Sequence, residues 1–270
     1  MTRPTFVESR DGHLLAYRDE GSGSPVVFVH GWSLSGDIWQ PQIEFLVANA
    51  HRAIVYDRRG HGHSAKPPAG YDYDTLSDDL AAVLTHTGVD DATLVVHSMA
   101  SGEAVRYFSR HGGKRIARLL FVAPTTPFAL KTADNPDGLP GEIWDGMVAA
   151  LTNDRKAYLT NGAPSLVGQN ATAETTRWAL DMALRAAPNA LVQCMRAFTE
   201  TDFRGEMAAI KVPSLILYGT GDLPLIASNA ARTRAAIAGS SIDAYEGAPH
   251  GIFITDRERF DADLLRFARS

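Results

Sequence analysis

A serine that follows an apolar run is the residue of this chain best placed to act as a nucleophile. Ser98 comes after the apolar residues 94–96, and a helical pattern begins just behind it. A serine on a sharp strand-to-helix turn projects its hydroxyl above the edge of a sheet, and the N–H of the next residue points to where an oxyanion would form. The segment therefore predicts a nucleophilic serine, although an ordinary helix N-cap would account for the same residue.

An acid and a histidine later in the chain are suited to activate this serine. Asp222 closes the segment that begins with the apolar run 215–218, and His250 lies in a loop rich in glycine and proline, residues 246–251. A serine hydroxyl is a poor nucleophile at neutral pH, so a base must take its proton, and imidazole titrates in the right range. A carboxylate on the other ring nitrogen fixes the tautomer of that base. The three residues have the types that acyl transfer requires.

The order and spacing of several motifs resemble those of a known superfamily. They are His-Gly-Trp at 30–32, Tyr-Asp-Arg-Arg-Gly-His-Gly-His-Ser at 56–64, Tyr-Asp-Tyr-Asp-Thr-Leu at 71–76, the segment around Ser98, Gly-Thr-Gly-Asp at 219–222 and Gly-Ala-Pro-His-Gly at 247–251. The chain order serine, acid, histidine is that of the α/β-hydrolases and differs from that of chymotrypsin-like and subtilisin-like proteases. The chain resembles the α/β-hydrolase superfamily and, more narrowly, its cofactor-free haloperoxidase and aryl-esterase-like group.

The resemblance implies roles for five residues. Carried over by position, the nucleophile falls on Ser98, the acid on Asp222 and the base on His250. The two oxyanion donors fall on the backbone N–H groups of Trp32 and Met99. No metal and no organic cofactor is expected for this chemistry.

Apolar runs alternate with helical patterns along the chain, which predicts an α/β fold with a mostly parallel sheet flanked by helices. Strands are expected near 12–20, 25–30, 53–56, 93–96, 119–122, 214–217 and 241–245, and helices over 74–87, 101–111 and 228–238. The alternation is interrupted from 124 to 203, where helical spacing runs over 142–159 and 174–201. The superfamily places its helical cap at this point. We therefore expect a base domain of residues 1–124 and 204–270 and a helical cap insertion of residues 125–203.

Composition restricts the partners and the compartment. The formal net charge is −5 and no cluster of Lys and Arg stands out, so nucleic acid and anionic membranes are not expected partners. The N-terminal segment lacks the apolar core of a signal peptide, and no run approaches the roughly 18 apolar residues of a membrane span, so a cytoplasmic protein is expected. Cys194 is the one cysteine and is expected to be a buried, inert thiol. A homo-oligomer is left open.

The remaining histidines and one further acid are expected to be structural. His61 and His63 have a metal-like spacing, but they lie in a glycine-rich turn without other ligands at zinc-like spacing. His30 is expected to shape the loop that carries an oxyanion donor, and His97 is expected to flank the serine. Asp57 also ends a strand, yet the two arginines that follow it favour a salt-bridged loop over catalysis.

The resemblance implies a serine hydrolase that cleaves small to medium carboxylic esters, aryl esters or lactones through an acyl-enzyme. Two alternatives use the same residues: perhydrolysis, in which hydrogen peroxide replaces water and the peracid oxidises halide, and cleavage of a carbon–carbon bond in a ring-fission product. A ligand receptor on a hydrolase scaffold is the alternative outside enzymology. In the haloperoxidase-like relatives a proline commonly follows His-Gly-Trp, whereas this chain has Ser33, which argues against peroxidative activity.

The segment around the serine departs from the usual Gly-x-Ser-x-Gly pattern, because Val96 and Ala100 occupy the two glycine positions. Their β-carbons need space where helix and strand approach each other, so Ala100 is either neatly packed or holds the Met99 N–H off its best geometry. Ala100→Gly decides between the two: if the methyl displaces the donor, the substitution should raise kcat for a 4-nitrophenyl ester and lower the free energy of unfolding by about 0.5–1 kcal/mol. Steady-state kinetics and chemical denaturation measure these effects. A joint loss of activity and stability would instead mean that the alanine belongs to a refitted site.

Overall fold

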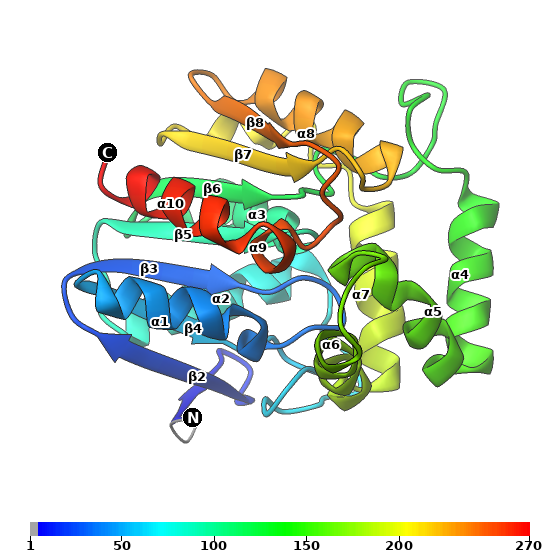
Figure 1. Ribbon diagram of the computed structural model, residues 1–270, viewed down its shortest axis with the longest axis horizontal. Coiled ribbons are helices and arrows are strands. Elements are labelled where there is room, and N and C mark those ends of the chain that lie inside the picture. The colour runs from blue at the N-terminus through cyan, green and yellow to red at the C-terminus, as the bar shows by residue number, and fades with distance from the viewer. Residues whose placement is uncertain (1–4) are drawn as a thin grey trace.

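The computed structural model describes residues 5–270 and contains an eight-stranded sheet with helices on both faces (Figure 1). The strands lie in the order β1-β2-β4-β3-β5-β6-β7-β8. Their bounds are β1 (Thr5–Glu8), β2 (Leu14–Gly21), β3 (Ser24–Val29), β4 (His51–Tyr56), β5 (Ala92–His97), β6 (Ile116–Val122), β7 (Ser214–Gly219) and β8 (Ser241–Tyr245). Strands β3 to β8 run parallel, and β1 and β2 form antiparallel pairs. The predicted α/β fold with a mostly parallel sheet is confirmed.

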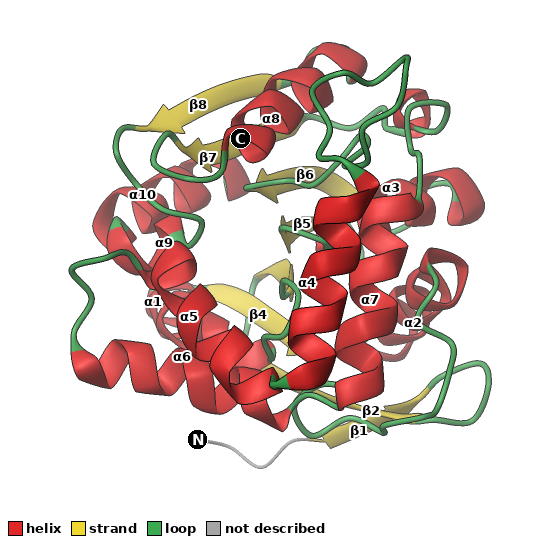
Figure 2. Ribbon diagram, turned by 90° about the vertical axis from the view of Figure 1, so that its right-hand side faces the viewer, coloured by secondary structure: helices red, strands yellow, loops and turns green. Residues whose placement is uncertain are grey.

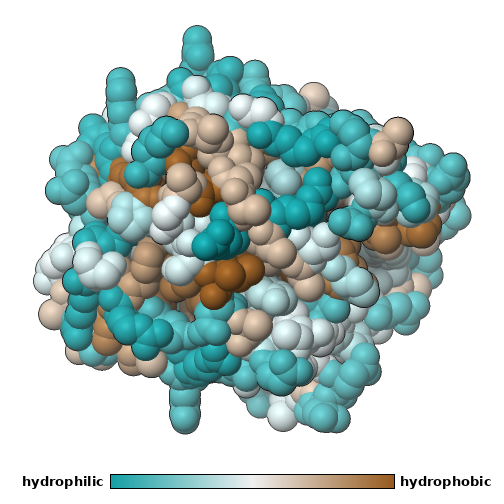
Figure 3. Space-filling view, turned by 90° about the horizontal axis from the view of Figure 1, so that it is seen from above, coloured by the Kyte–Doolittle hydropathy of each residue, from teal (hydrophilic) through white to brown (hydrophobic). Residues whose placement is uncertain are grey.

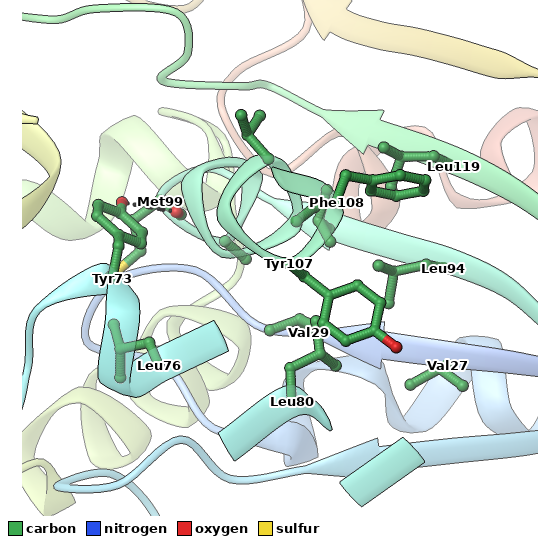
Figure 4. Close-up of a cluster of buried hydrophobic side chains, with 14 of the residues drawn as sticks. Val27, Val29, Tyr73, Leu76, Leu80, Leu94, Met99, Tyr107, Phe108 and Leu119 are labelled. Atoms are coloured by element: carbon green, nitrogen blue, oxygen red, sulfur yellow. Dashed lines mark hydrogen bonds between the residues drawn. The ribbon is translucent and has the colours of Figure 1, made fainter. Parts of the chain in front are cut away.

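Successive residues of the central strands face opposite layers of helices. In β3, Val27 and Val29 belong to one buried cluster, whereas Val26 and Phe28 belong to a second cluster on the other face. Figure 4 shows part of the first cluster, in which Tyr107 from the helix at 100–111 joins Val27 and Val29 of the strand. Strands that are buried on both faces read as continuous apolar runs. This is why the central strands are visible in the sequence.

Two sets of helices supply the other half of each cluster. The first cluster receives side chains from α2 (Tyr73–His86), α3 (Ala100–His111) and α8 (Pro224–Ala236). The second receives them from α1 (Gln40–Ala48), α9 (Ile252–Thr255) and α10 (Arg257–Ala268). Two short 3-10 helices, η1 (Gly36–Trp39) and η2 (Met207–Ala209), complete the elements around the sheet. The sheet is thus enclosed between two helical layers.

Four further helices lie together beyond the carboxyl ends of the parallel strands (Figures 1 and 2). They are α4 (Gly141–Asn153), α5 (Arg155–Val167), α6 (Ala173–Arg185) and α7 (Pro188–Glu200). The segments 142–159 and 174–201, which carry helical spacing, are each divided into two helices. Asp154 leaves the helical conformation and its side chain accepts a backbone N–H of α5. Pro188 begins α7 because proline lacks an N–H and disfavours the helical conformation in the residue before it.

Several elements lie outside the segments predicted from the sequence. They include β1, α1, α9 and α10, and α8 begins at Pro224 rather than at 228. In β1 only Val7 is buried, so its four residues carry too little alternation to predict a strand. β2 begins at Leu14 and not at 12, because the backbone turns there through a hydrogen bond from Ser9 N to His13 O.

The surface is mixed in polarity. Figure 3 shows hydrophilic side chains over much of one face, with hydrophobic groups between them. The exposed large hydrophobic side chains of residues 5–270 come from different elements and are Phe6, Leu14, Val47, Ile143, Leu223 and Ile242. Among the helices of this described range, none combines the length and the apolar character that a membrane span requires.

Candidate active site

Ser98 lies in the two-residue turn between β5 and α3, at the carboxyl edge of the sheet. The φ of Ser98 is 56°, in the left-handed region that residues other than glycine rarely adopt, and the residue is 8% exposed. The turn is fixed by three hydrogen bonds: Ser98 N donates to Val122 O at 2.9 Å, and the carbonyl of Ser98 accepts from Ser101 N at 3.0 Å and Ser101 Oγ at 2.7 Å. The backbone around Ser98 therefore has the strained, well-anchored geometry of a strand-to-helix turn.

A glycine in the loop after β3 allows that loop to approach the turn closely. A Cβ placed on Gly31 would lie 2.5 Å from His97 Nδ1 and 3.3 Å from Ser98 Cβ, so the loop after β3 needs glycine there. Val96 and Ala100 stand in the glycine positions of the usual pattern, and both are fully buried in the first core cluster. The packing around the turn accommodates their β-carbons while Ser98 keeps its left-handed φ.

The structure brings His250 and Asp222 together. His250 Nδ1 lies 2.5 Å from Asp222 Oδ2, and Leu223 N donates to Asp222 Oδ1 at 2.6 Å. The side chain of Asp222 is 2% exposed and that of His250 is 19% exposed. An ionised carboxylate only accepts hydrogen bonds, so Nδ1 of His250 is the donor in this pair, and in the neutral ring Nε2 is then the acceptor. The acid is thus oriented through both of its oxygens.

Two loops meet closely to make this pair. A Cβ on Gly219, at the end of β7, would lie 2.1 Å from Ala248 O, and one on Gly221 would lie 2.5 Å from Gly247 O. Gly221 N also donates to Ala248 O at 3.0 Å. The absence of side chains at both glycines brings the loop of the acid against the loop of His250.

His97 has a closer relation to His250 than its position in the sequence indicates. The two imidazole rings are 4.7 Å apart, and His97 Nε2 lies 3.3 Å from the carbonyl oxygen of His250. Burial holds the pKa of His97 well below its ordinary value, and the neighbouring His250 ring lowers it further, so the His97 ring is neutral. Its Nδ1 is buried without a hydrogen-bond partner among residues 5–270. His97 packs between the nucleophile turn and the histidine loop, a contact that no local pattern predicts.

Ser98 and His250 lie on adjoining segments but are not directly bonded. Within residues 5–270, Ser98 Oγ makes no hydrogen bond with the imidazole of His250. Hydrogen bonds between a catalytic base and its nucleophile are often long or poorly aligned until substrate binds. The acid and the base are thus already paired. Ser98 directly follows His97, whose ring contacts the ring of the base.

Of the two expected oxyanion donors, Met99 lies in the nucleophile turn, and Trp32 follows Gly31, the glycine that faces Ser98. The N–H groups of Trp32 and Met99 donate to no other group within the described part of the chain. Met99 is further fixed by Tyr73, whose hydroxyl donates to the Met99 carbonyl at 2.8 Å, as Figure 4 shows. The indole N–H of Trp32 donates to Leu191 O in α7 at 2.8 Å, and its ring meets Tyr158 of α5 edge-on. The loop that carries Trp32 is therefore tied to the helices above the sheet.

The histidines with metal-like spacing have separate surroundings. His61 is buried, with Nδ1 2.9 Å from the carbonyl oxygen of Arg59, and burial lowers its pKa to about 3. His63 is half-exposed and lies 3.4 Å from Asp57. No group of three or more histidine, cysteine or acidic side chains suited to a metal gathers within residues 5–270. Cys194 is buried and free, and burial raises the pKa of its thiol to about 12.

The loop after β4 is salt-bridged, as its arginines indicate, but Asp57 does not pair with them. Asp57 accepts backbone N–H groups of Gly36 at 2.7 Å and His63 at 2.8 Å. Arg58 is instead bonded to Glu103 on α3, in a pair that is fully buried. Glu103 is not among the residues predicted to be functional, and an acid in the first turn of an otherwise buried helix is the signal that could have identified it.

A groove of about 730 Å³ opens beside the acid, between the end of α5, the start of α6 and the loops around 222 and 247. Asp222 and Pro249 line it, together with Thr172 and Glu246. Ser98 is not among its lining residues. This groove therefore does not contain the expected nucleophile.

Comparisons with known proteins agree with the fold described above. Residues 24–256 match the family described as alpha/beta hydrolase fold. A non-heme chloroperoxidase of Kitasatospora aureofaciens is 37% identical over 96% of this chain and 97% of its own, and a bifunctional esterase/perhydrolase of Acinetobacter calcoaceticus is 33% identical over 98% and 99%. The solved structure of an esterase from Exiguobacterium antarcticum is 28% identical, with a TM-score of 0.95 over 98% of this chain and 99% of that one.

The close contact at Gly219 leads to a testable prediction. Gly219→Ala should push the 247–249 backbone away from β7 and lengthen the bond between Asp222 and His250, while overpacking lowers the free energy of unfolding by about 1–3 kcal/mol. Chemical denaturation gives the stability, and the downfield proton signal of the His250 Nδ1–H in NMR reports the bond. Gly146→Ala in α4 is the control, because a Cβ there meets nothing within 4 Å. An unchanged proton signal in Gly219→Ala would mean that the close contact between Gly219 and Ala248 does not position His250 against Asp222.

Proposed function

The chain belongs to the α/β-hydrolase fold family, and on that premise we propose that it hydrolyses carboxylic esters through an acyl-enzyme on Ser98. The observation that carries the proposal is the 2.5 Å contact between His250 Nδ1 and Asp222 Oδ2, next to a serine in a left-handed turn. An imidazole oriented in this way presents Nε2 as a proton acceptor. The names of relatives described as esterases support the same class of reaction.

Acylation begins with the attack of Ser98 Oγ on the ester carbonyl carbon. His250 Nε2 takes the hydroxyl proton as the carbon–oxygen bond forms, and the carbonyl oxygen becomes an oxyanion. When the tetrahedral species collapses, the bond to the leaving alkoxy group breaks and His250 returns the proton to that oxygen. The alcohol leaves, and the acyl group remains on Ser98.

Deacylation repeats these steps with water as the nucleophile. His250 takes a proton from water as its oxygen attacks the acyl carbon, and the proton then passes to Ser98 Oγ as the acyl–serine bond breaks. The carboxylic acid leaves and the hydroxyl of Ser98 is restored. Asp222 stays ionised throughout, because its role is to fix the tautomer of His250 and to stabilise the transient imidazolium.

The N–H groups of Trp32 and Met99 are proposed to receive the oxyanion. Met99 lies in the turn that carries Ser98 and Trp32 follows Gly31 in the facing loop, and neither N–H is used by another acceptor within residues 5–270. Donors that are already oriented need no reorganisation when charge develops, and removal of a single such donor typically costs about 10²–10³ in kcat.

An apolar ester is the substrate class that the surroundings favour. Trp32 packs against a cluster of side chains from the helices above the sheet, which includes Leu151, Leu191 and Met195 together with the ring of Tyr158. Aromatic and aliphatic side chains beside an oxyanion donor favour apolar acyl or alcohol groups. Small to medium esters, aryl esters and lactones have this character.

A second candidate is perhydrolysis, in which hydrogen peroxide replaces water in deacylation. The chloroperoxidase and perhydrolase names of two relatives favour it. The conformation after Trp32 argues against it, since Ser33 has a φ of 64°. Proline, the residue common at this position in haloperoxidase-like relatives, is restricted to a φ near −65°, so a loop with proline must follow a different path. We therefore place ester hydrolysis first.

The unity of the three proposed catalytic groups can be tested by substitution. Ser98→Ala and His250→Ala should each lower kcat for 4-nitrophenyl acetate by about 10⁴-fold or more, and Asp222→Asn by a comparable or smaller factor, because the groups act together. A fluorophosphonate should label Ser98 alone, as intact-protein and peptide mass spectrometry would show. Full activity in Ser98→Ala would refute the mechanism, and tight ligand binding without any turnover would favour the receptor alternative.

The pH dependence of kcat/KM should show a single protonation step. His250 must be neutral to accept the Ser98 proton, so activity should rise with pH and then level off. Burial holds the pKa values of His30 and His97 well below their ordinary value, so both rings are neutral near neutral pH and add no further step. Steady-state rates in a constant-ionic-strength buffer series measure the profile. Two steps on the acid limb, or a loss of activity with a chelator, would contradict this interpretation.

A further inference from the structure

The most deeply buried ion pair of the site joins Arg58 to Glu103. Both side chains are fully buried, and Arg58 Nε donates to Glu103 Oε1 at 2.6 Å. Tyr56 donates its hydroxyl to the other oxygen of Glu103 at 3.0 Å. Burying two charges costs several kcal/mol each, and well-packed apolar residues of similar size are often at least as stable. The pair therefore calls for an explanation other than stability.

Arg58 contacts the loop that carries the first oxyanion donor at successive peptide groups. Its guanidinium donates to His30 O at 2.6 Å and to Gly31 O at 3.3 Å. Its backbone N–H donates to His30 Nε2 at 2.9 Å, so the proton of the neutral imidazole is on Nδ1, which lies 2.8 Å from Gly31 O. The carbonyl of Gly31 thus receives both the guanidinium and the imidazole N–H.

The direction of that carbonyl determines the direction of the Trp32 N–H. The carbonyl of Gly31 and the N–H of Trp32 belong to one planar trans peptide, so they point in opposite directions. Because Gly31 O points toward the buried guanidinium, the Trp32 N–H points away from it. The same geometry applies at the second donor, where the Ser98 carbonyl is bound by Ser101 and the Met99 N–H points the other way.

Glu103 connects this arrangement to the nucleophile. It lies on α3, the helix that begins directly after Ser98 and Met99. Contacts connect α3 to the Gly31 carbonyl through Glu103 and Arg58. They therefore fix the Trp32 N–H, the first donor, relative to the helix that positions the serine. A displacement of one relative to the other would require the buried pair to break.

We infer that Arg58 and Glu103 are positioning residues, which orient the Trp32 N–H toward the oxyanion formed on Ser98. The inference rests on the proposed function, since it concerns the same oxyanion. Neither side chain touches the reacting atoms. They act through the Gly31–Trp32 peptide, and their contribution is expressed in the transition state and not in substrate binding.

The neighbouring Arg59 provides a matched control. Its side chain is also buried, and it donates to Asp79 at 2.6 Å and 2.7 Å and to Asp11. Within residues 5–270 it makes no hydrogen bond to the loop at 30–32. Both arginines are therefore buried and paired with an acid, but only Arg58 contacts the loop at 30–32.

The test compares two double variants of the full chain. Arg58→Met/Glu103→Gln removes both charges and leaves an amide oxygen for the hydroxyl of Tyr56, and Arg59→Met/Asp79→Asn makes the equivalent change at the control pair. Each is assayed for kcat and KM with 4-nitrophenyl acetate, for inhibition by 2,2,2-trifluoroacetophenone, whose carbonyl forms a tetrahedral oxyanion with serine, and for inhibition by acetophenone. Thermal unfolding is followed for both.

The Arg58 variant is expected to lose about tenfold or more in kcat with KM changed by less than about twofold. Trifluoroacetophenone should bind more weakly by the same factor as kcat/KM falls, and acetophenone should bind as before. The Arg59 variant should keep kcat within about twofold, whatever its loss of thermal stability. Retention of kcat in the Arg58 variant, or an equal loss of kcat in both, would overturn the inference.

If the Arg58 double variant does not fold, Arg58→Lys and Arg59→Lys decide the matter, since each keeps the buried positive charge. An ammonium lacks the planar fork that lets Arg58 reach Glu103 and both carbonyls together, so only Arg58→Lys should lower kcat. Equal kcat in the two lysine variants overturns the inference alone. A wild-type chain with no ester turnover, or with turnover unaffected by Ser98→Ala, overturns the proposed function and the inference with it.

Discussion

The left-handed turn at Ser98 is the constraint on which the rest of the site depends. The chain must change from a central strand to a helix within two residues, and the strained φ of 56° is maintained because the carbonyl of Ser98 and the N–H of Ser98 are both bonded to neighbouring segments. β5 lies between β3 and β6, so the loops that follow those strands border the turn on either side. Gly31 is then required by contact, since any side chain there would collide with His97.

The helices above the sheet connect the two halves of the site. On one side, the indole of Trp32 donates to Leu191 O in α7. On the other, the N–H of His250 donates to Ser165 O in α5 at 3.0 Å, and the next N–H of the histidine loop donates to α5 as well. The oxyanion side and the acid–base side are thus bonded to the same group of helices. A change in how those helices pack would alter the relative position of donor and base, and not merely the access of substrate.

The fold was predicted from the sequence where burial is two-sided or periodic. The central strands appear as continuous apolar runs because helices cover both faces of the sheet, and α2 appears through the spacing of its buried leucines and its one valine. β1, α1 and α10 were not predicted. β1 is short and buries only Val7. The helical spacing does not show that the segment 142–159 turns at Asp154 or that the segment 174–201 turns before Pro188. Periodicity records which side chains face inward, and it does not record where the backbone changes direction.

For the site, the sequence by itself determined the types and order of the candidate groups: a serine after a strand, an acid after another strand and a histidine in a late loop. Local backbone physics suffices for this, because each group follows an element whose apolar pattern is visible. Only the tertiary structure decided that Glu103 pairs with Arg58, that His97 packs on His250, and that the 219–222 and 247–250 loops touch. These contacts join segments far apart in the chain, and their partners are selected by how the loops meet once the sheet has formed. No local pattern encodes such a meeting, because the free energy that selects it arises from burial and hydrogen bonding between segments and not within them.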